Sequence, residues 1–407
     1  MKSYDHQELV ITGIGITTAV GQGKEAVTNA LLEGCHAFRI MERPGRQEAS
    51  AFIGAEIDGL IYPPDISKKT LRTASYAAEV ALVTLHEAWE DAQLQHVDPT
   101  RVGLIIGGSN VQQRDHTMLQ DNYRGRTQFI RPTYGLSFMD SDLCGLCTEQ
   151  FGIRGLAHTV GGASASGQLA ILSAIQAVLS GEVDVCIAIG SLMDLSYWEF
   201  HGLRALGAMG TTKFADNPTE ACRPFDREHD GFIYGECCGA LVIERSSFAS
   251  QRHASLYAGI AGWGMTMDAN RNPNPSLEGE CTVIRKALNK AGLLPKDIDY
   301  INPHGTGSLI GDEIELEAIQ TCNLSHAYMN TTKSIFGHGL TGAGAVELIA
   351  TILQMETGML HPSRNLINPI VPGMNWVKEQ AIAHPVHYAL SLSFGFGGIN
   401  TAICLQR

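Results

Sequence analysis

Short apolar strands that alternate with glycine-rich turns and helices constrain the fold of this chain more than any other feature. Residues 8–21, 101–108 and 183–190 each contain a nearly continuous apolar run, with helical patterns between them. Strands that are apolar on both faces belong inside a sheet covered by helices on each side. Their alternation with helices predicts parallel strands joined by right-handed crossovers. We therefore expect an α/β fold.

The same order of elements starts again after residue 252. The second series is a strand and turn, a helix, a strand, a glycine-preceded helix and a last strand, over residues 255–264, 282–292, 298–305, 341–358 and 388–398. The two series share little sequence identity, but their common order suggests an internal duplication. A chain of 407 residues is long enough for two cores. We therefore divide it into an N-terminal half, residues 1–251, and a C-terminal half, residues 252–407.

Residues 157–181 contain a glycine-rich turn that leads into an apolar helix. The small residues before the first helical turn would let another backbone or a ligand approach the helix N-terminus, where unpaired N–H groups favour negative charge. Ser164 or Ser166 could equally be an ordinary helix cap, because serine is a preferred cap whatever the function. This stretch alone leaves both interpretations open.

Charge and hydropathy limit the classes of partner. A formal net charge of -13 argues against general nucleic-acid binding, which relies on Lys and Arg at phosphates. No apolar run is long enough to span a membrane, and the first ten residues lack the apolar core of a secretory signal, so we expect a cytoplasmic protein. The ten cysteines lie mostly in apolar segments, which is typical of reduced, buried thiols. Cys144 and Cys147 form an isolated CxxC without the second pair or nearby histidine of a metal site.

Polar residues follow predicted strands of the C-terminal half, where active sites in such sheets usually gather. His304 lies after one strand, Lys333 and His338 lie five residues apart around Gly337, and Phe394 and Phe396 lie in a last glycine-rich turn. A single histidine in a turn is more often structural. Together with the turn before the apolar helix, these residues would supply hydrogen-bond donors and a cation around a site large enough for a thioester.

These motifs resemble those of the β-ketoacyl synthases of fatty acid and polyketide assembly, over nearly the whole chain. HGTGSLIGDEIE at 304–315 resembles the first histidine motif of the family, TKSIFGHGLTGAGAVE at 332–347 its lysine and second histidine motif, and RPFDREHDGFIYGECCGALVIE at 223–244 the segment between. The resemblance implies a thiolase-like fold, with two duplicated halves, mostly parallel five-stranded sheets and αβαβα layers. It also makes a homodimer the expected assembly.

One departure from the family pattern concerns the nucleophile. The family has a cysteine in a T-A-C-x-S-G motif, whereas residues 162–167 read GASASG and place Ser164 at the cysteine position. A cysteine at a helix N-terminus has a lowered pKa, but a serine hydroxyl stays protonated without a dedicated base. We therefore expect Ser164 to be a poor acyl acceptor.

The resemblance leaves the other half-reaction of the family possible, which is loss of carbon dioxide from a malonyl thioester. The family assigns the donors for the thioester oxygen to two histidines, here His304 and His338. By the same resemblance Lys333 would orient and polarise the site. Three acids would be tied to the histidine and lysine loops, although solvated charge at helix starts explains them equally well: Asp312, Glu315 and Glu347.

Aromatic residues would complete this site. Phe396 aligns with the gating phenylalanine of the family, and its backbone N–H would share an oxyanion hole with that of Ser164. Walls formed by Phe394, Phe396 and Met193 would favour decarboxylation, because the carboxylate loses hydration in an apolar pocket. The alternative is that both phenylalanine rings simply pack in the core.

A short basic cluster, Lys68, Lys69 and Arg72, resembles the cluster with which related synthases dock an acidic acyl carrier protein. A solvated helix face would explain the same residues. Because the substrate would arrive on the phosphopantetheine arm of the carrier protein, we expect no separate cofactor and no metal.

The function that we expect is decarboxylation of malonyl carrier protein to acetyl carrier protein, in polyketide β-branching or starter-unit supply. The chain resembles the serine-variant synthase homologues of such pathways. Two alternatives remain open at this point. One is an acyltransferase or condensing enzyme that forms a Ser164 ester, and the other is a non-catalytic subunit similar to a chain-length factor.

Overall fold

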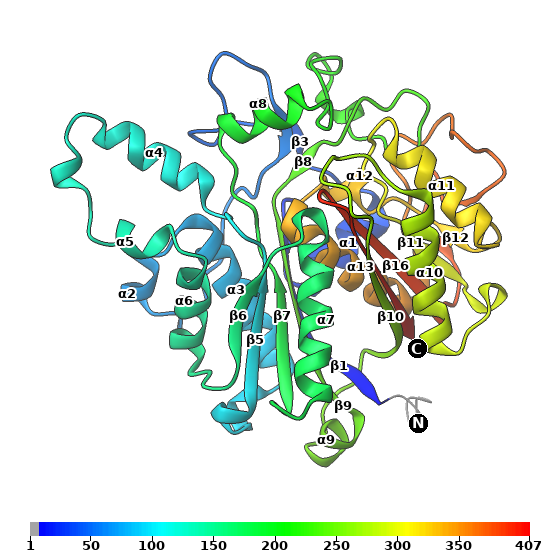
Figure 1. Ribbon diagram of the computed structural model, residues 1–407, viewed down its shortest axis with the longest axis horizontal. Coiled ribbons are helices and arrows are strands. Elements are labelled where there is room, and N and C mark those ends of the chain that lie inside the picture. Colours follow the sequence, from blue (N-terminus) through cyan, green and yellow to red (C-terminus); the bar gives the residue numbers. More distant parts are fainter. Residues whose placement is uncertain (1–7) are drawn as a thin grey trace.

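The computed structural model describes residues 8–407 and contains one long sheet that runs through both halves of the chain (Figure 1). Its strands follow the spatial order β14-β12-β11-β16-β17-β10-β1-β9-β7-β5-β6. Their bounds are β1 Leu9–Thr18, β5 Val102–Gly107, β6 Ala157–Val160, β7 Val185–Gly190, β9 Cys237–Arg245, β10 Ala258–Met267, β11 Tyr300–Asn302, β12 Tyr328–Met329, β14 Asn375–Trp376, β16 Tyr388–Gly395 and β17 Ile399–Gln406. Six short strands lie outside this path. Strand β2 Gly21–Gln22 pairs with β1, a separate three-stranded sheet contains β3 Phe38–Ile40, β4 Ile53–Ala55 and β8 Tyr234–Gly235, and a two-stranded sheet contains β13 Met359–Leu360 and β15 Ile382–Ala383.

The α-helices of the described residues are α1 Lys24–Glu33, α2 Lys68–Leu71, α3 Tyr76–Asp91, α4 Gln113–Tyr123, α5 Tyr134–Ser137, α6 Ser141–Phe151, α7 Ser166–Leu179, α8 Tyr197–Ala205, α9 Ser246–Gln251, α10 Leu277–Ala291, α11 Gly311–Thr321, α12 Lys333–Phe336 and α13 Ala343–Thr357. One predicted helix, over residues 69–93, is instead the two helices α2 and α3. The chain breaks between them because the hydroxyl of Ser75 caps α3 by accepting a hydrogen bond from Ala78 N.

The strand directions correct the expectation of mostly parallel, five-stranded sheets. In each half the strands near the outer edge are parallel, but β9 and β17 run antiparallel to both of their neighbours. A tight turn joins β16 to β17, so that these strands can only be antiparallel. The N-terminal half has five strands on the path, whereas the short β14 makes six in the C-terminal half. The α/β class is confirmed, with mixed sheets.

The two halves repeat one order of elements. The N-terminal half contains β1, α3, β5, α6, β6, α7, β7 and β9, and the C-terminal half contains β10, α10, β11, α11, β12, α13, β16 and β17. The first strands of the halves pair with each other, with Val10 opposite Gly259 and Ile11 opposite Ala258. Because the sheet is continuous through this pair, the boundary between residues 251 and 252 stays a prediction.

The helices form the αβαβα layers that the resemblance implies. Helices α7 and α13 pack on each other and lie between the two half-sheets, where they contribute to one large buried cluster. Helix α3 covers the outer face of the N-terminal half-sheet, and α10 and α11 cover the outer face of the other (Figure 1). Close packing at the centre requires glycine, since a Cβ on Gly167 would lie 2.6 Å from Ala345 N.

Further expectations concern cysteines and membranes. All ten cysteines are free thiols, and apart from the exposed Cys35 they are buried. Within residues 8–407, no cluster of His, Cys, Asp and Glu could hold a metal ion, and no helix is long and apolar enough to cross a membrane. The prediction about a secretory signal depends partly on residues 1–7, which lie outside the described residues.

Candidate active site

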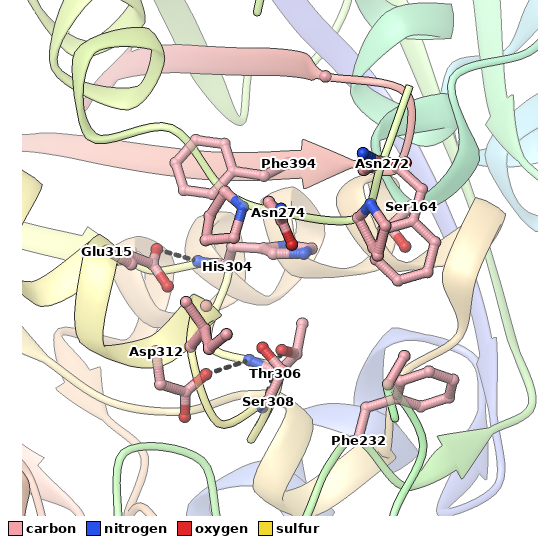
Figure 2. A pocket seen from close by; sticks show the side chains of 18 of the residues that line it. Ser164, Phe232, Asn272, Asn274, His304, Thr306, Ser308, Asp312, Glu315 and Phe394 are labelled. Atoms are coloured by element: carbon pink, nitrogen blue, oxygen red, sulfur yellow. Dashed lines mark hydrogen bonds between the residues drawn. The ribbon is translucent and has the colours of Figure 1, made fainter. Parts of the chain in front are cut away.

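One cavity of about 270 Å³ receives side chains from both halves of the chain. Ser164 comes from the turn directly before α7, whereas His304, His338 and Phe394 come from loops and a strand end of the C-terminal half. Figure 2 shows Ser164, His304 and Phe394 around this space. Because chemically active side chains from distant segments meet in a concave site, this cavity is the candidate active site.

The backbone before α7 presents Ser164 to the cavity. Ala163 has a φ of 47°, a conformation that residues other than glycine seldom adopt outside functional sites. The Ser164 hydroxyl lies 2.9 Å from His338 Nε2 and makes no helix-cap hydrogen bond. Ser166 holds the turn instead, accepting a hydrogen bond from Gly162 N and donating one to Ala163 O. The interpretation of Ser164 as a helix cap is therefore wrong.

His338 lies between the end of α12 and the start of α13 and is fixed by its backbone. Its N–H donates to Ile233 O at 2.7 Å, and its carbonyl accepts from Gly235 N at 3.2 Å. The ring of Phe232 packs edge-on against the imidazole at 5.2 Å. Nδ1 of His338 is buried and has no hydrogen-bond partner among the described residues. The ring can therefore exchange hydrogen bonds only through Nε2, on the side of Ser164.

Two buried carboxylates of α11 shape the loop that carries His304. Glu315 accepts hydrogen bonds from His304 N at 2.6 Å and Gly305 N at 2.8 Å. Asp312 accepts from the backbone N–H groups of residues 306 and 307 at 3.1 and 3.0 Å. Both acids are almost fully buried. They are tied to the histidine loop, as the resemblance implies, and are not solvated charges at a helix start.

Lys333 lies behind the histidines and does not line the cavity. Its ammonium group donates to the carbonyl of His304 and pairs with Glu347 of α13. Lys333 and Glu347 are each only 2% exposed, so Glu347 is not solvated charge either. The cation of Lys333 therefore acts on the site through its hydrogen bond to the His304 backbone and through its electrostatic effect on the two imidazoles.

Burial and the charge of Lys333 keep both imidazoles neutral. Burial lowers the pKa of His338 well below its ordinary value, and the nearby Lys333 lowers it further. The pKa of His304 is lowered by the same two causes and also by His338, whose ring lies 5.5 Å away. A neutral imidazole still carries one N–H. The cavity therefore presents two neutral donors where negative charge could develop on a ligand oxygen.

Aromatic residues line the cavity only in part as predicted. Phe394 packs edge-on against His304 with ring centres 5.5 Å apart, and Phe396 is 40% exposed at the mouth. Neither ring is simply core packing. Met193 was expected to form a wall, and this expectation is wrong, because Met193 packs in a separate cluster with Phe200 and does not line the cavity.

The turn that carries Phe396 lies directly against the Ser164 turn. Ser393 Oγ donates to Ser164 O at 3.2 Å, and a Cβ on Gly395 would lie 2.3 Å from Gly162 O. Two backbone segments thus meet at one side of the cavity. The oxyanion hole that Ser164 and Phe396 would share stays a prediction.

The basic cluster lies away from these residues. Lys68 and Lys69 belong to α2, Arg72 follows it, and all three are exposed. None of them lines the cavity. Their part in carrier-protein docking stays a prediction.

Several residues of the cavity wall were not predicted from the sequence, and three of them lie between β10 and the first turns of α10. Asn272 and Asn274 lie in the loop between β10 and α10, and Glu280 lies in the first turns of α10. Polar residues after a strand end were a possible signal for the asparagines. Glu280 could not be found in this way, because an acid near the start of a helix is usually explained by its favourable interaction with the helix dipole.

Glu280→Gln is expected to stabilise the protein, and increasingly so as the pH rises. Glu280 is 1% exposed, its Oε2 has no partner among the described residues, and burial next to Glu315 and Asp268 raises its pKa well above the ordinary value. Above the unfolded pKa the unfolded chain loses this proton while the folded chain keeps it, so folding becomes less favourable with rising pH. Thermal unfolding is measured from about pH 5 to pH 8. The free energy of unfolding of the variant should exceed that of the wild type by a margin that grows with pH to about 1–3 kcal/mol. A constant difference in Tm would contradict this.

Comparison with known proteins places this chain in a family. Family models match the chain as the N-terminal domain of β-ketoacyl synthase over residues 6–249 and the C-terminal domain over residues 257–367. The polyketide biosynthesis malonyl-ACP decarboxylase PksF of Bacillus subtilis (strain 168) is 63% identical over 400 residues, which cover 98% of this chain and 96% of the relative.

Solved structures agree with the family models. A β-ketoacyl synthase from Burkholderia phymatum STM815 superimposes with a TM-score of 0.91 at 27% identity, over 98% of this chain and 99% of its own. A type II polyketide ketosynthase in complex with its acyl carrier protein superimposes with a TM-score of 0.84 at 25% identity, over the same shares. The fold is therefore thiolase-like, and the chain belongs to the β-ketoacyl synthase family.

Proposed function

We propose that this enzyme decarboxylates a malonyl thioester on an acyl carrier protein, giving acetyl carrier protein and carbon dioxide in polyketide biosynthesis. The observation that carries the proposal is the composition of the cavity. It contains two neutral histidines and a serine at the α7 N-terminus, and no cysteine of the described residues lines it. The similarity to the malonyl-ACP decarboxylase of B. subtilis supports the same reaction.

The chemistry needs only groups that the cavity presents. The bond between the α-carbon and the carboxylate breaks, and its electron pair forms an enolate on the thioester. N–H groups of His304 and His338 stabilise the charge that develops on the thioester oxygen. A proton from solvent then reaches the α-carbon to give the acetyl group. Burial, together with the charge of Lys333, lowers the pKa of both imidazoles, so that they donate hydrogen bonds as neutral rings.

The contact between Ser164 and His338 also makes acyl transfer through a Ser164 ester a candidate function. At 2.9 Å the imidazole is within reach of the hydroxyl proton. A base of this kind is normally oriented by a third group on its other nitrogen, but Nδ1 of His338 has no partner among residues 8–407. The geometry therefore favours decarboxylation. A non-catalytic role like that of a chain-length factor would not require the buried Lys333 and Glu347 pair behind the histidines.

The partner proposal is an acyl carrier protein that delivers its substrate on a phosphopantetheine arm, so that no separate cofactor is needed. The similar ketosynthase solved with its carrier protein supports this partner. Docking through Lys68, Lys69 and Arg72 is part of the proposal. So is a homodimer, which the unpaired edge strand β6 and its exposed His158 support. Location in the cytoplasm remains an expectation.

The proposal is tested by incubating the enzyme with malonyl carrier protein and measuring the intact mass of the carrier. We expect conversion to acetyl carrier protein without an added acyl acceptor. A carrier that stays malonylated at high enzyme concentration would contradict the proposal.

Ser164→Ala is expected to retain appreciable decarboxylation, within about tenfold of the wild-type rate, because the hydroxyl forms no covalent intermediate and its loss removes one hydrogen bond. The rate of acetyl carrier protein formation measures this. Complete inactivity of Ser164→Ala, together with an acylated Ser164 peptide in the wild-type enzyme, would favour the ester mechanism instead.

A further inference from the structure

We infer that the side-chain amides of Asn272 and Asn274 bind the free carboxylate of the malonyl group and select carboxylated over plain acyl substrates. This inference rests on the proposed function, because only a malonyl-type substrate brings a carboxylate into the cavity. It goes beyond that function by naming the residues that recognise the leaving group.

The loop that carries the two asparagines is fixed at both ends. At its start, Asp268 N donates to Gly398 O at 2.8 Å and Asn400 Nδ2 donates to Asp268 Oδ1 at 2.7 Å. At its end, Ser276 caps α10 by accepting a hydrogen bond from Gly279 N at 3.1 Å. The loop is therefore held against the turn that carries Phe396.

Within the loop, the side chain of Asn270 hydrogen-bonds to the backbones of the other two asparagines. Asn270 accepts a hydrogen bond from Asn272 N at 3.0 Å and donates one to Asn274 O at 3.4 Å. These bonds engage the backbones of Asn272 and Asn274 and leave their side-chain amides available. In the view of Figure 2, Asn274 lies between His304 and Ser164, and Asn272 lies beside Ser164. Both residues line the cavity with the two histidines.

The charges around the cavity determine where a substrate carboxylate can lie. No Arg or Lys of the described part of the chain lines the cavity, so neutral donors must receive the carboxylate. Asp268, Glu280 and Glu315 line the same cavity, and the latter two are almost fully buried. Burial raises the pKa of Glu280 well above its ordinary value and that of Glu315 to about 8, so neither group offers a cation to the substrate carboxylate. Asn272 and Asn274 are exposed at the mouth.

Neutral amides suit a carboxylate that must leave as carbon dioxide. Two amide N–H groups replace part of the hydration that the carboxylate loses in the cavity, and so they orient it. A cation at this place would stabilise the ground-state carboxylate more strongly and would oppose its departure. With the carboxylate at the mouth and the thioester oxygen at the histidines, carbon dioxide is released toward solvent.

The test measures affinity for two carriers that differ only in the carboxylate. In a His304→Ala background, whose turnover is expected to be about 10²–10³-fold slower, the Kd is measured for malonyl and for acetyl carrier protein before appreciable turnover. The background protein should bind the malonyl form more tightly. Asn274→Leu should weaken malonyl binding about tenfold, close to 1.4 kcal/mol, and leave acetyl binding unchanged. Asn274→Asp should weaken malonyl binding further, because its carboxylate repels that of the substrate.

Arg271→Ala is the matched control, since Arg271 belongs to the same loop but does not line the cavity. Any effect of this variant should be equal for the two carriers. Equal affinities of the background protein for both carriers, or equal losses in the Asn274 variants, would overturn the inference. Because binding is measured before appreciable turnover, this outcome is separate from failure of the decarboxylation assay with the wild-type enzyme, which would contradict the proposed function.

Discussion

His304→Ala and His338→Ala are each expected to lower the decarboxylation rate by about 10²–10³-fold, because each removes one donor to the developing enolate oxygen. Both rings are neutral and their backbones are held by hydrogen bonds, so that the donors are aligned before the substrate arrives. His338 is buried and His304 is partly buried. Initial rates of acetyl carrier protein formation measure the effect. The loss should appear mainly in kcat, since the donors act on charge that develops during the reaction.

The matched control for these variants is His387→Ala, which changes an exposed histidine outside the cavity. It should keep the wild-type rate. Near wild-type turnover of both the His304 and the His338 variants would show that the oxyanion is stabilised elsewhere.

Lys333→Met is expected to destabilise the protein by about 3–5 kcal/mol, because it leaves Glu347 without its counter-ion in a buried site. Burial already raises the pKa of Glu347 to about 7, and Lys333 opposes that rise. Without the lysine the folded carboxyl holds its proton to still higher pH, while the unfolded one ionises at its ordinary value. The free energy of unfolding of the variant should therefore keep falling as the pH rises above about 7. In the wild type, ionisation of Glu347 lowers the stability no further above that pH.

Denaturant unfolding at several pH values measures this effect, and the double variant Lys333→Met with Glu347→Gln is its control. The double variant should recover part of the stability and lose the added pH dependence, because no unpaired titratable group remains. Equal stability of the single and double variants at every pH would show that the unpaired Glu347 does not cause the loss of stability.

The sequence predicted the layers and the residues of the site better than the strand directions. Continuous apolar strands and the repeated order of elements indicate a covered sheet, but apolarity says nothing of strand direction. The sheets were therefore expected to be mostly parallel, and the antiparallel β9 and β17 were not anticipated. Residues near one another in the motifs, such as His304 with Glu315, could be assigned to one loop from sequence. The distance between Ser164 and His338 could not, because it depends on how α7 packs against the start of α13.

Residues whose position relative to the cavity depends on tertiary packing were the hardest to predict. Lys333 was expected around the substrate but lies behind His304, since its ammonium is drawn to the buried Glu347 and a backbone carbonyl. Met193 was assigned to the wall from its apolar character alone, which fits any core position. Asn272 and Asn274 stood in a stretch with no motif, and only the fixed loop brings them to the cavity mouth.

The central claim is that this cavity releases carbon dioxide from a malonyl thioester without acylating Ser164. Intact-mass spectra of enzyme and carrier protein, taken together through one reaction, test it most directly. We predict that acetyl carrier protein accumulates while the enzyme keeps its unmodified mass at every time point. Accumulation of an acyl-enzyme at Ser164, or a malonylated carrier that does not change, would contradict the claim.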